Sequence, residues 1–79
     1  MTPTILRKNG YRFFFFSREE PRMHVHVMSN KGEAKFWLEP ELELAMNYGF
    51  SRKEIKEVEA LIEERYNEFV NEWHRHFNS

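Results

Sequence analysis

The chain has 79 residues, no cysteine, and a formal net charge of −1 at pH 7. This length supports one domain, and the lack of cysteine excludes disulfide-stabilised scaffolds, cysteine catalysis and cysteine zinc sites. All 13 acidic residues are glutamate, so any carboxylate pair or triad would have to use Glu. The longest apolar run, residues 13–16, is far shorter than the roughly 20 residues of a membrane span, and no run of signal-peptide length opens the chain. We therefore expect a soluble, cytoplasmic protein.

Charge is distributed unevenly along the chain. The charged residues of 1–39 sum to +3, and those of 40–79 sum to −4. The first half is also rich in aromatic residues. This asymmetry can produce a basic face, or internal ion pairs can cancel it.

The first half of the chain predicts four short strands, at residues 4–8, 11–17, 23–28 and 33–38. Asn9-Gly10, between the first two, is a preferred pair for a tight hairpin turn because both central positions need positive φ. The aromatic residues that follow suit a pleated, half-buried surface. Short turns join the remaining strands, which predicts an antiparallel meander.

The second half predicts helices over residues 41–48 and 52–77. The first has helix-forming composition and stops at Gly49. Ser51 and Glu54 match a capping box, which marks the start of the second. Apolar residues then recur at steps of three and four, as on one face of a helix. A single helix of this length would span about 39 Å and exceed the sheet, so it must bend, break or overhang.

These elements predict an α+β fold with one domain over residues 1–79. It consists of a four-stranded antiparallel meander, a short helix, and a long C-terminal helix packed on one face of the sheet. The opposite face, edged by basic residues, is then the candidate working surface.

The most informative motif places His24 and His26 two residues apart on a strand. Such side chains point to the same face, with Cα atoms roughly 6.5–7 Å apart. One chemical interpretation is acid–base catalysis of metal-free RNA cleavage, in which one imidazole accepts a proton and the other donates one. Arg22 or Lys35 would hold the phosphate.

Metal binding, anion binding and a purely structural role are the alternatives for this pair. Two neutral imidazoles can share a zinc ion at about 2.0–2.1 Å, but a site needs a third and usually a fourth ligand. The candidates for those ligands are Glu20, Glu33, His74 and His76. None lies at a diagnostic spacing, so we predict no metal and no other cofactor.

Two aromatic segments have both a structural and a functional interpretation. Residues 13–16, with Arg12 and Arg18, can form a base-stacking platform edged by cations, although a domain this small needs most of these rings for its core. An overhanging helix end that bears Trp73 and Phe77 would favour a partner protein or a homodimer.

The second half also carries an acidic row at helical spacing. Glu64, Glu68 and Glu72 follow one another at steps of four and would share one helix face. Such a row is normally a solvated face, but a basic partner can also use it.

The order of five motifs resembles a known family. A Gly10-Tyr-Arg-Phe-Phe-Phe strand precedes Glu20-Pro and His24-Val-His-Val; the strand from Ala34 to Leu38, the segment from Tyr48 to Ser51, and Trp73 with His76-Phe77 follow. This order resembles the small bacterial domain-of-unknown-function family numbered four-one-six-zero, over nearly the whole chain from Pro3 to Phe77. Arg22-Met23 stands where the family pattern Glu-Pro-Pro-His-x-His has one proline.

The resemblance implies a small α+β protein of unassigned role. Members are often encoded beside another short protein, in an arrangement similar to toxin–antitoxin modules. The motif positions that carry over to this chain are Glu20, Pro21, His24, His26, Lys35 and Trp37.

The sequence and the resemblance together lead to the hypothesis of a toxin–antitoxin-like component that binds a partner protein. The partner is either a protein from a neighbouring gene or a second copy of the chain. In one version of the hypothesis the chain also binds RNA. In its sharper form it is a metal-independent ribonuclease. The residues assigned in that form are His24 and His26 for catalysis, Arg22 and Lys35 for phosphate, and Trp73 and Phe77 for the partner. The alternatives are a non-enzymatic protein-binding module and a small metal-binding protein.

Overall fold

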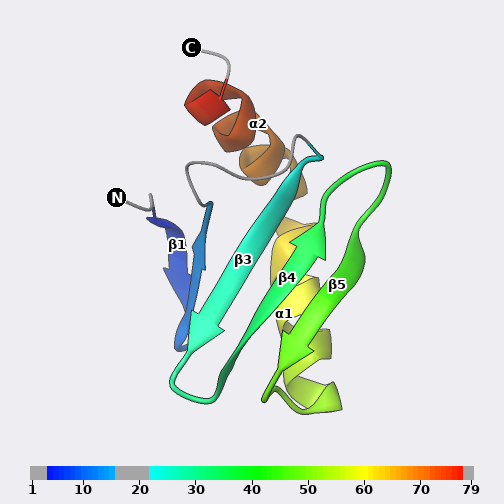
Figure 1. The fold of residues 1–79 in the computed structure, drawn as a ribbon. Helices are drawn as coiled ribbons and strands as arrows, with labels where there is room; N and C mark the ends of the chain where they lie inside the picture. Colours follow the sequence, from blue (N-terminus) through cyan, green and yellow to red (C-terminus); the bar gives the residue numbers. More distant parts are fainter. Residues whose placement is uncertain (1–3, 16–21, 78–79) are drawn as a thin grey trace.

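The computed structural model describes residues 4–15 and 22–77, which form an α+β fold (Figure 1). The strands are β1 (Thr4–Lys8), β2 (Tyr11–Phe14), β3 (His24–Ser29), β4 (Gly32–Trp37) and β5 (Glu43–Tyr48). They make one antiparallel sheet in the order β1-β2-β3-β4-β5, followed by α1 (Arg52–Glu64) and α2 (Tyr66–Phe77). Within the described ranges, no helix has both the length and the apolar character needed to cross a membrane.

The meander continues to a fifth strand, so the prediction of four strands and a short helix over residues 41–48 is wrong. The segment that was expected to be this helix forms β5 and pairs antiparallel with β4. Its Glu, Leu, Ala and Met residues favour a helix, but a helix of this length is marginal without packing. The edge of β4 offers a full row of backbone partners, and this tertiary contact overrides the local propensity.

The predicted long helix breaks at Arg65, whose backbone (φ −120°, ψ 25°) leaves the helical region. The Arg65 amide donates to the Ile62 carbonyl at 3.1 Å, which ends α1 with a tighter turn. The break lets the buried Phe69 and Trp73 of α2 fold back onto the core instead of continuing past the sheet. Of the three expected solutions to the excess length, the chain adopts the break.

The hydrophobic core lies between the helices and one face of the sheet. Alternate residues of β2, β3 and β4 point to it, including Phe13, Val25 and Phe36, each with no exposed surface. The Tyr66 hydroxyl donates to the Leu38 carbonyl and ties the start of α2 to the end of β4. Burial of this apolar surface is the main stabilising term of the fold.

Several local predictions agree with the structure. Asn9 and Gly10 have positive φ values of 55° and 85° and form the β1–β2 turn. Ser51 and Glu54 make both hydrogen bonds of the capping box. The strand expected over 11–17 ends at Phe14, and residues 16 and 17 lie outside the described residues.

Candidate functional site

One face of the sheet, opposite to the hydrophobic core, carries three of the predicted site residues: His24, His26 and Lys35. The strand registers place three rows of side chains on it: Arg12, Met28, Glu33 and Tyr48; Phe14, His26, Lys35 and Met46; and His24, Trp37 and Glu43. We call these residues the distal face. Because paired residues of an antiparallel sheet point to the same side, each row forms a continuous band across neighbouring strands.

The two histidines lie inside an aromatic cluster on this face. His24 has no exposed surface and His26 is 5% exposed. Their ring centroids are 5.2 Å apart, and His24 also contacts Trp37 at 5.7 Å and Trp73 at 5.2 Å. Phe14 stacks on His26 at 5.6 Å. The catalytic interpretation of the sequence needs both rings to be accessible to RNA, whereas the structure buries them.

The backbone of Arg22 sets the proton position of His24. Nδ1 of His24 lies 2.7 Å from the Arg22 carbonyl oxygen. A carbonyl only accepts hydrogen bonds, so we assign a proton to Nδ1. The same bond holds the chain just before β3 against the aromatic cluster.

Arg22 and Lys35, the predicted phosphate-binding residues, are brought together on one ring. The Arg22 guanidinium carbon lies 4.2 Å from the Trp37 ring centroid, and Lys35 Nζ lies 4.4 Å from it. Arg22 also donates from Nε to the Glu39 carbonyl at 2.9 Å and approaches Glu43 at 3.7 Å. Its side chain remains 40% exposed, so this cationic rim of the cluster is accessible from outside.

The other proposed ligands do not gather around the histidines. Among residues 4–15 and 22–77, no group of three or more His and Glu side chains is arranged to hold a metal ion. His74 and His76 are exposed on α2, and His76 contacts Phe15 and Phe77. Glu20 and Pro21 of the motif lie outside the described residues.

Trp73 and Phe77, the predicted partner-binding residues, pack within the chain. Trp73 is 7% exposed and contacts Phe15 at 5.2 Å and Phe77 at 4.1 Å. Phe77 is partly buried against the core. Most of the surface of these two side chains therefore anchors α2 to the rest of the chain. Their role in partner binding stays a prediction.

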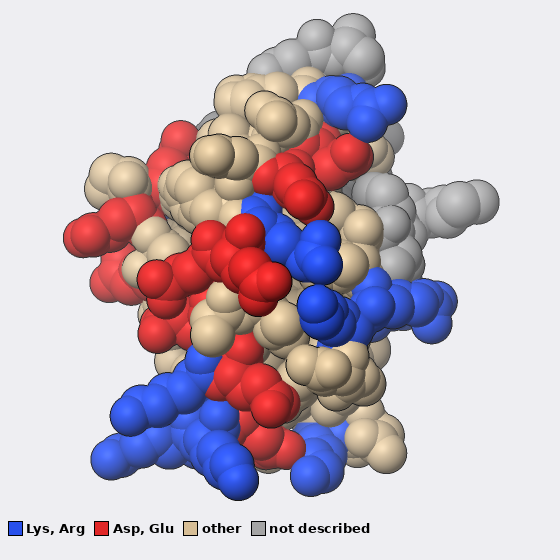
Figure 2. Space-filling view, turned by 180° about the vertical axis from the view of Figure 1, so that it is seen from behind, with Lys and Arg blue, Asp and Glu red and all other residues tan. Residues whose placement is uncertain are grey.

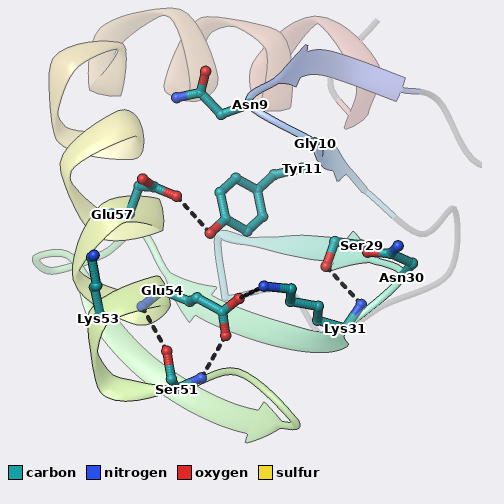
Figure 3. Close-up of a pocket in the computed structure, with 10 residues that line it drawn as sticks. All are labelled: Asn9, Gly10, Tyr11, Ser29, Asn30, Lys31, Ser51, Lys53, Glu54 and Glu57. Atoms are coloured by element: carbon teal, nitrogen blue, oxygen red, sulfur yellow. Dashed lines mark hydrogen bonds and ion pairs between the residues drawn. The ribbon is translucent and has the colours of Figure 1, made fainter.

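A polar pocket that the sequence did not reveal lies at the opposite end of the sheet (Figure 3). It has a volume of about 510 Å³ and lies between the β1–β2 turn, the β3–β4 turn and the start of α1. Its lining comprises Asn9, Gly10, Tyr11, Ser29, Asn30, Lys31, Ser51, Lys53, Glu54 and Glu57. The Asn9-Gly10 turn and the capping box are the sequence signals that fall on parts of it, and neither indicated a pocket.

The pocket is crossed by interactions between distant parts of the chain. The Tyr11 hydroxyl donates to Glu57 Oε1 at 2.7 Å, and Lys31 Nζ lies 3.1 Å from Glu54 Oε2 (Figure 3). The Ser51 amide also donates to Glu54, and this bond, followed by the Lys31 hydrogen bond, lowers the Glu54 pKa. These pairs join both turns to α1, so the pocket has a structural role in the free protein.

We expect Tyr11 to ionise only near pH 12 in the folded chain. Burial of the phenol, followed by its hydrogen bond to Glu57, raises the pKa of Tyr11 from 10.0 to about 12. Since the folded state holds this proton more tightly, the stabilisation is complete below pH 10 and is lost as the pH rises from 10 to 12. Tyr11→Phe removes this dependence and costs about 0.5–1.5 kcal/mol at neutral pH.

The measurement is a urea titration of both proteins at several pH values, with tyrosinate absorbance recorded in parallel. Tyr48, which is 70% exposed, provides the matched control Tyr48→Phe. A Tyr11→Phe protein that loses stability above pH 10 as steeply as the wild type would contradict the assignment.

The fold and its distal face define a class: a small α+β domain with a five-stranded antiparallel meander, two helices, and an aromatic cluster with a cationic rim that Trp73 of α2 also contacts. The chain belongs to the DUF4160 family, a domain of unknown function, whose family model matches residues 10–74. This match confirms the family resemblance of the sequence. No curated protein and no solved structure matches the chain.

Proposed function

We propose that the chain is the protein-binding component of a toxin–antitoxin-like pair and that the distal face is its contact surface. The composition of that face carries the proposal. Tyr, Trp, Met and Arg are the residues enriched in protein interfaces, and all four types occur there side by side. Tyr48 is 70% exposed and Met28 is 36% exposed, so two of these residues already present large apolar groups to a partner.

The position of β5 supports a protein partner. It ends the sheet order, and five of its six residues are exposed. Leu44 adds a further exposed apolar side chain at 39%. An edge strand of this kind offers both backbone groups and apolar side chains to an incoming segment.

In this proposal the two histidines position the contact residues and do not act on a substrate. His24 packs its ring against the edge of Trp37 and binds the carbonyl of Arg22. Arg22 in turn covers the Trp37 ring. His24 thus helps to hold Arg22 and Trp37 in place.

The test is titration of the purified chain with the neighbouring-gene protein that the family resemblance implies. Tyr48→Ala and Lys35→Glu each remove a contact of the distal face and are expected to weaken binding at least about tenfold, as for residues at the centre of an interface. Lys56→Glu, on the exposed surface of α1, is the matched charge control and should leave the affinity unchanged. Full affinity of the double variant Tyr48→Ala, Lys35→Glu would refute this surface assignment.

A metal-independent ribonuclease is the second candidate, favoured by the position of Arg22 and Lys35 beside His24. In that reaction one imidazole takes the 2′-hydroxyl proton while the 2′-oxygen attacks phosphorus. The bond from phosphorus to the 5′-oxygen breaks, and the other imidazolium protonates that oxygen. The products are a 2′,3′-cyclic phosphate and a free 5′-hydroxyl. Both rings would have to become accessible to RNA.

The ribonuclease is tested by incubating the chain with RNA in the presence of a chelator. His26→Phe preserves ring stacking on Phe14 and removes the proton-transfer group, so it separates chemistry from packing. Cleavage by the wild type but not by the folded His26→Phe protein would support catalysis. Absence of cleavage by the wild type, or equal cleavage by both, would exclude the pair as catalyst. Growth of a bacterial host on induced expression provides the same comparison in cells.

A further inference from the structure

An apolar groove runs between the first strand and the last helix. It has a volume of about 480 Å³ and is lined by Ile5, Leu6, Glu68, Phe69, Asn71, Glu72 and Arg75. Phe69 is 1% exposed and forms part of the core, while Ile5 and Leu6 are partly buried and pack against it. The groove therefore has an apolar base and a charged rim supplied by α2.

The strand beside this groove is an edge of the sheet. Within residues 4–15 and 22–77, β1 pairs with β2 and with no other strand. A register shift between Thr4 and Leu6 makes Ile5 an extra residue, which accounts for two successive apolar side chains against the core. An edge strand next to a helix-lined groove is the arrangement that accepts an added strand, whose side chains then fill the groove.

The α2 side of the groove carries Glu68 and Glu72 together with Arg75, and Lys8 of β1 lies on the same face of the sheet as Leu6. The Glu68 and Glu72 side chains are 66% and 43% exposed, and they pair with Arg65 at 3.4 Å and with Arg75 at 3.0 Å. β1 ends in Arg7 and Lys8. Figure 2 shows the side of the helices, where red acidic side chains gather in the middle and on the left, and blue basic side chains lie among them, to their right and at the lower left.

We propose that a second copy of this chain occupies the groove, with the two β1 strands paired antiparallel about a two-fold axis. One strand supplies what the groove requires, because it carries apolar residues 5 and 6 and, on the same face as Leu6, the base Lys8. If Leu6 opposes Leu6, then Lys8 opposes position 4 and Arg7 opposes Ile5, so no like charges face each other. The two sheets become one, and both groups of helices lie on its same side.

The direction of α2 places its acidic residues beside the basic end of the incoming strand. Phe69 contacts Phe13, the partner of Leu6, and Trp73 contacts Phe15 near the start of β1. Glu72 therefore lies towards the start of β1, where the antiparallel register delivers Lys8 of the second copy. Lys8 pairs in register with the core-facing Tyr11, which directs its side chain to the helix side of the sheet.

A closed pair also agrees with the size of the protein. A two-fold interface uses the same patch on both copies and leaves no open groove or β1 edge for further growth. Domains of this length bury only roughly 60% of their unfolded surface, and association is a common source of added stability. The β5 edge and the distal face stay available to a different partner.

Sedimentation of the full chain over a wide range of concentration tests this interface. The expected mass rises towards twice 9.8 kDa. Lys8→Glu and Glu72→Lys should each raise the dissociation constant at least about tenfold, and the double variant Lys8→Glu, Glu72→Lys should recover most of the loss because the charge pair is restored with exchanged signs. Lys56→Glu is the control and should associate as the wild type does.

A cross-link provides a second readout that does not depend on the charges. The chain has no cysteine, so Leu6→Cys introduces a single thiol. Opposed residues of an antiparallel pair have Cα atoms about 4.5–5.5 Å apart, within reach of a disulfide. We expect Leu6→Cys to form a disulfide dimer on mild oxidation, and Tyr48→Cys to form none.

Three outcomes would overturn the proposal. They are a monomer at every concentration, a dimer that neither charge variant weakens, and a dimer that Tyr48→Ala disrupts instead. Because Tyr48 belongs to the distal face, the last result would move self-association to that surface. Failure of the β1 interface leaves the proposed partner binding at the distal face intact.

Discussion

Trp73→Ala is expected to remove about 3–5 kcal/mol of folding free energy, the usual range for a large aromatic residue truncated in a core. A domain of this length has about 4–12 kcal/mol in total, so most of the population can unfold at 37 °C. The loss is large because Trp73 joins three groups at once: Phe15 after β2, Phe77 at the end of α2, and His24 on β3. Urea denaturation followed by far-ultraviolet circular dichroism measures it.

Phe77→Ala is the matched control, since this ring is only partly buried and contacts the same cluster. It should cost clearly less than Trp73→Ala. Trp37 is the other tryptophan of the chain, so fluorescence of the Trp73→Ala protein reports the distal face alone. A cost below about 1 kcal/mol would show that Trp73 is held loosely, and the sequence-based interpretation of a partner-binding ring would regain support.

Gly49→Ala is expected to destabilise the protein by about 2–5 kcal/mol. Its φ of +93° disfavours any side chain, which accounts for about 1–2 kcal/mol. A Cβ at this position would also meet the Lys31 carbonyl oxygen at 2.5 Å and Gly32 Cα at 3.2 Å, which adds about 1–3 kcal/mol for overpacking. Relief of this clash would move the start of β4 away from the end of β5. The two residues after Gly49 lead directly into α1.

Gly10→Ala isolates the two causes of this loss. Gly10 has a φ of +85°, but a Cβ there would have no atom within 4 Å. It should therefore show the cost of positive φ alone, about 1–2 kcal/mol. Equal denaturation midpoints for Gly10→Ala and Gly49→Ala would mean that the close approach of Gly49 to the β3–β4 turn is absent in solution.

The two variants also separate local from distant consequences. Asn47 binds the Phe50 backbone with both ends of its amide, at 3.0 and 3.2 Å, and so holds the chain between β5 and α1. Gly49→Ala disturbs this connection, whereas Gly10→Ala changes only the β1–β2 turn. Hydrogen exchange of the first turn of α1 should increase in the former and stay unchanged in the latter.

The sequence identified the candidate site through residue types whose spacing has a direct geometric meaning. Residues two apart on a strand share a face, so the common side of His24 and His26 followed from local geometry. Arg22 and Lys35 were grouped in the sequence only because both are basic. In the structure both lie over the Trp37 ring, because the segment before β3 runs beside β4. The long-range partner of Tyr11 had no local signal, since Glu57 lies 46 residues further along the chain.

Local interactions were determined by the sequence itself. The Asn9-Gly10 turn, the capping box at Ser51 and the apolar stripe of the helices each depend on residues within a few positions, where backbone sterics and short hydrogen bonds decide the outcome. The α+β class followed from the order of such segments.

Tertiary contacts decided the rest. Residues 43–48 became a strand because β4 offered an edge, and the helix broke at Arg65 because Phe69 and Trp73 gain more by burial than a straight helix gains by continuing. The histidines became buried because rings from β2, β4 and α2 converge on them. In each case the local preference is worth a few tenths of a kcal/mol per residue. Burial and pairing between distant segments are larger in sum and therefore decide the structure.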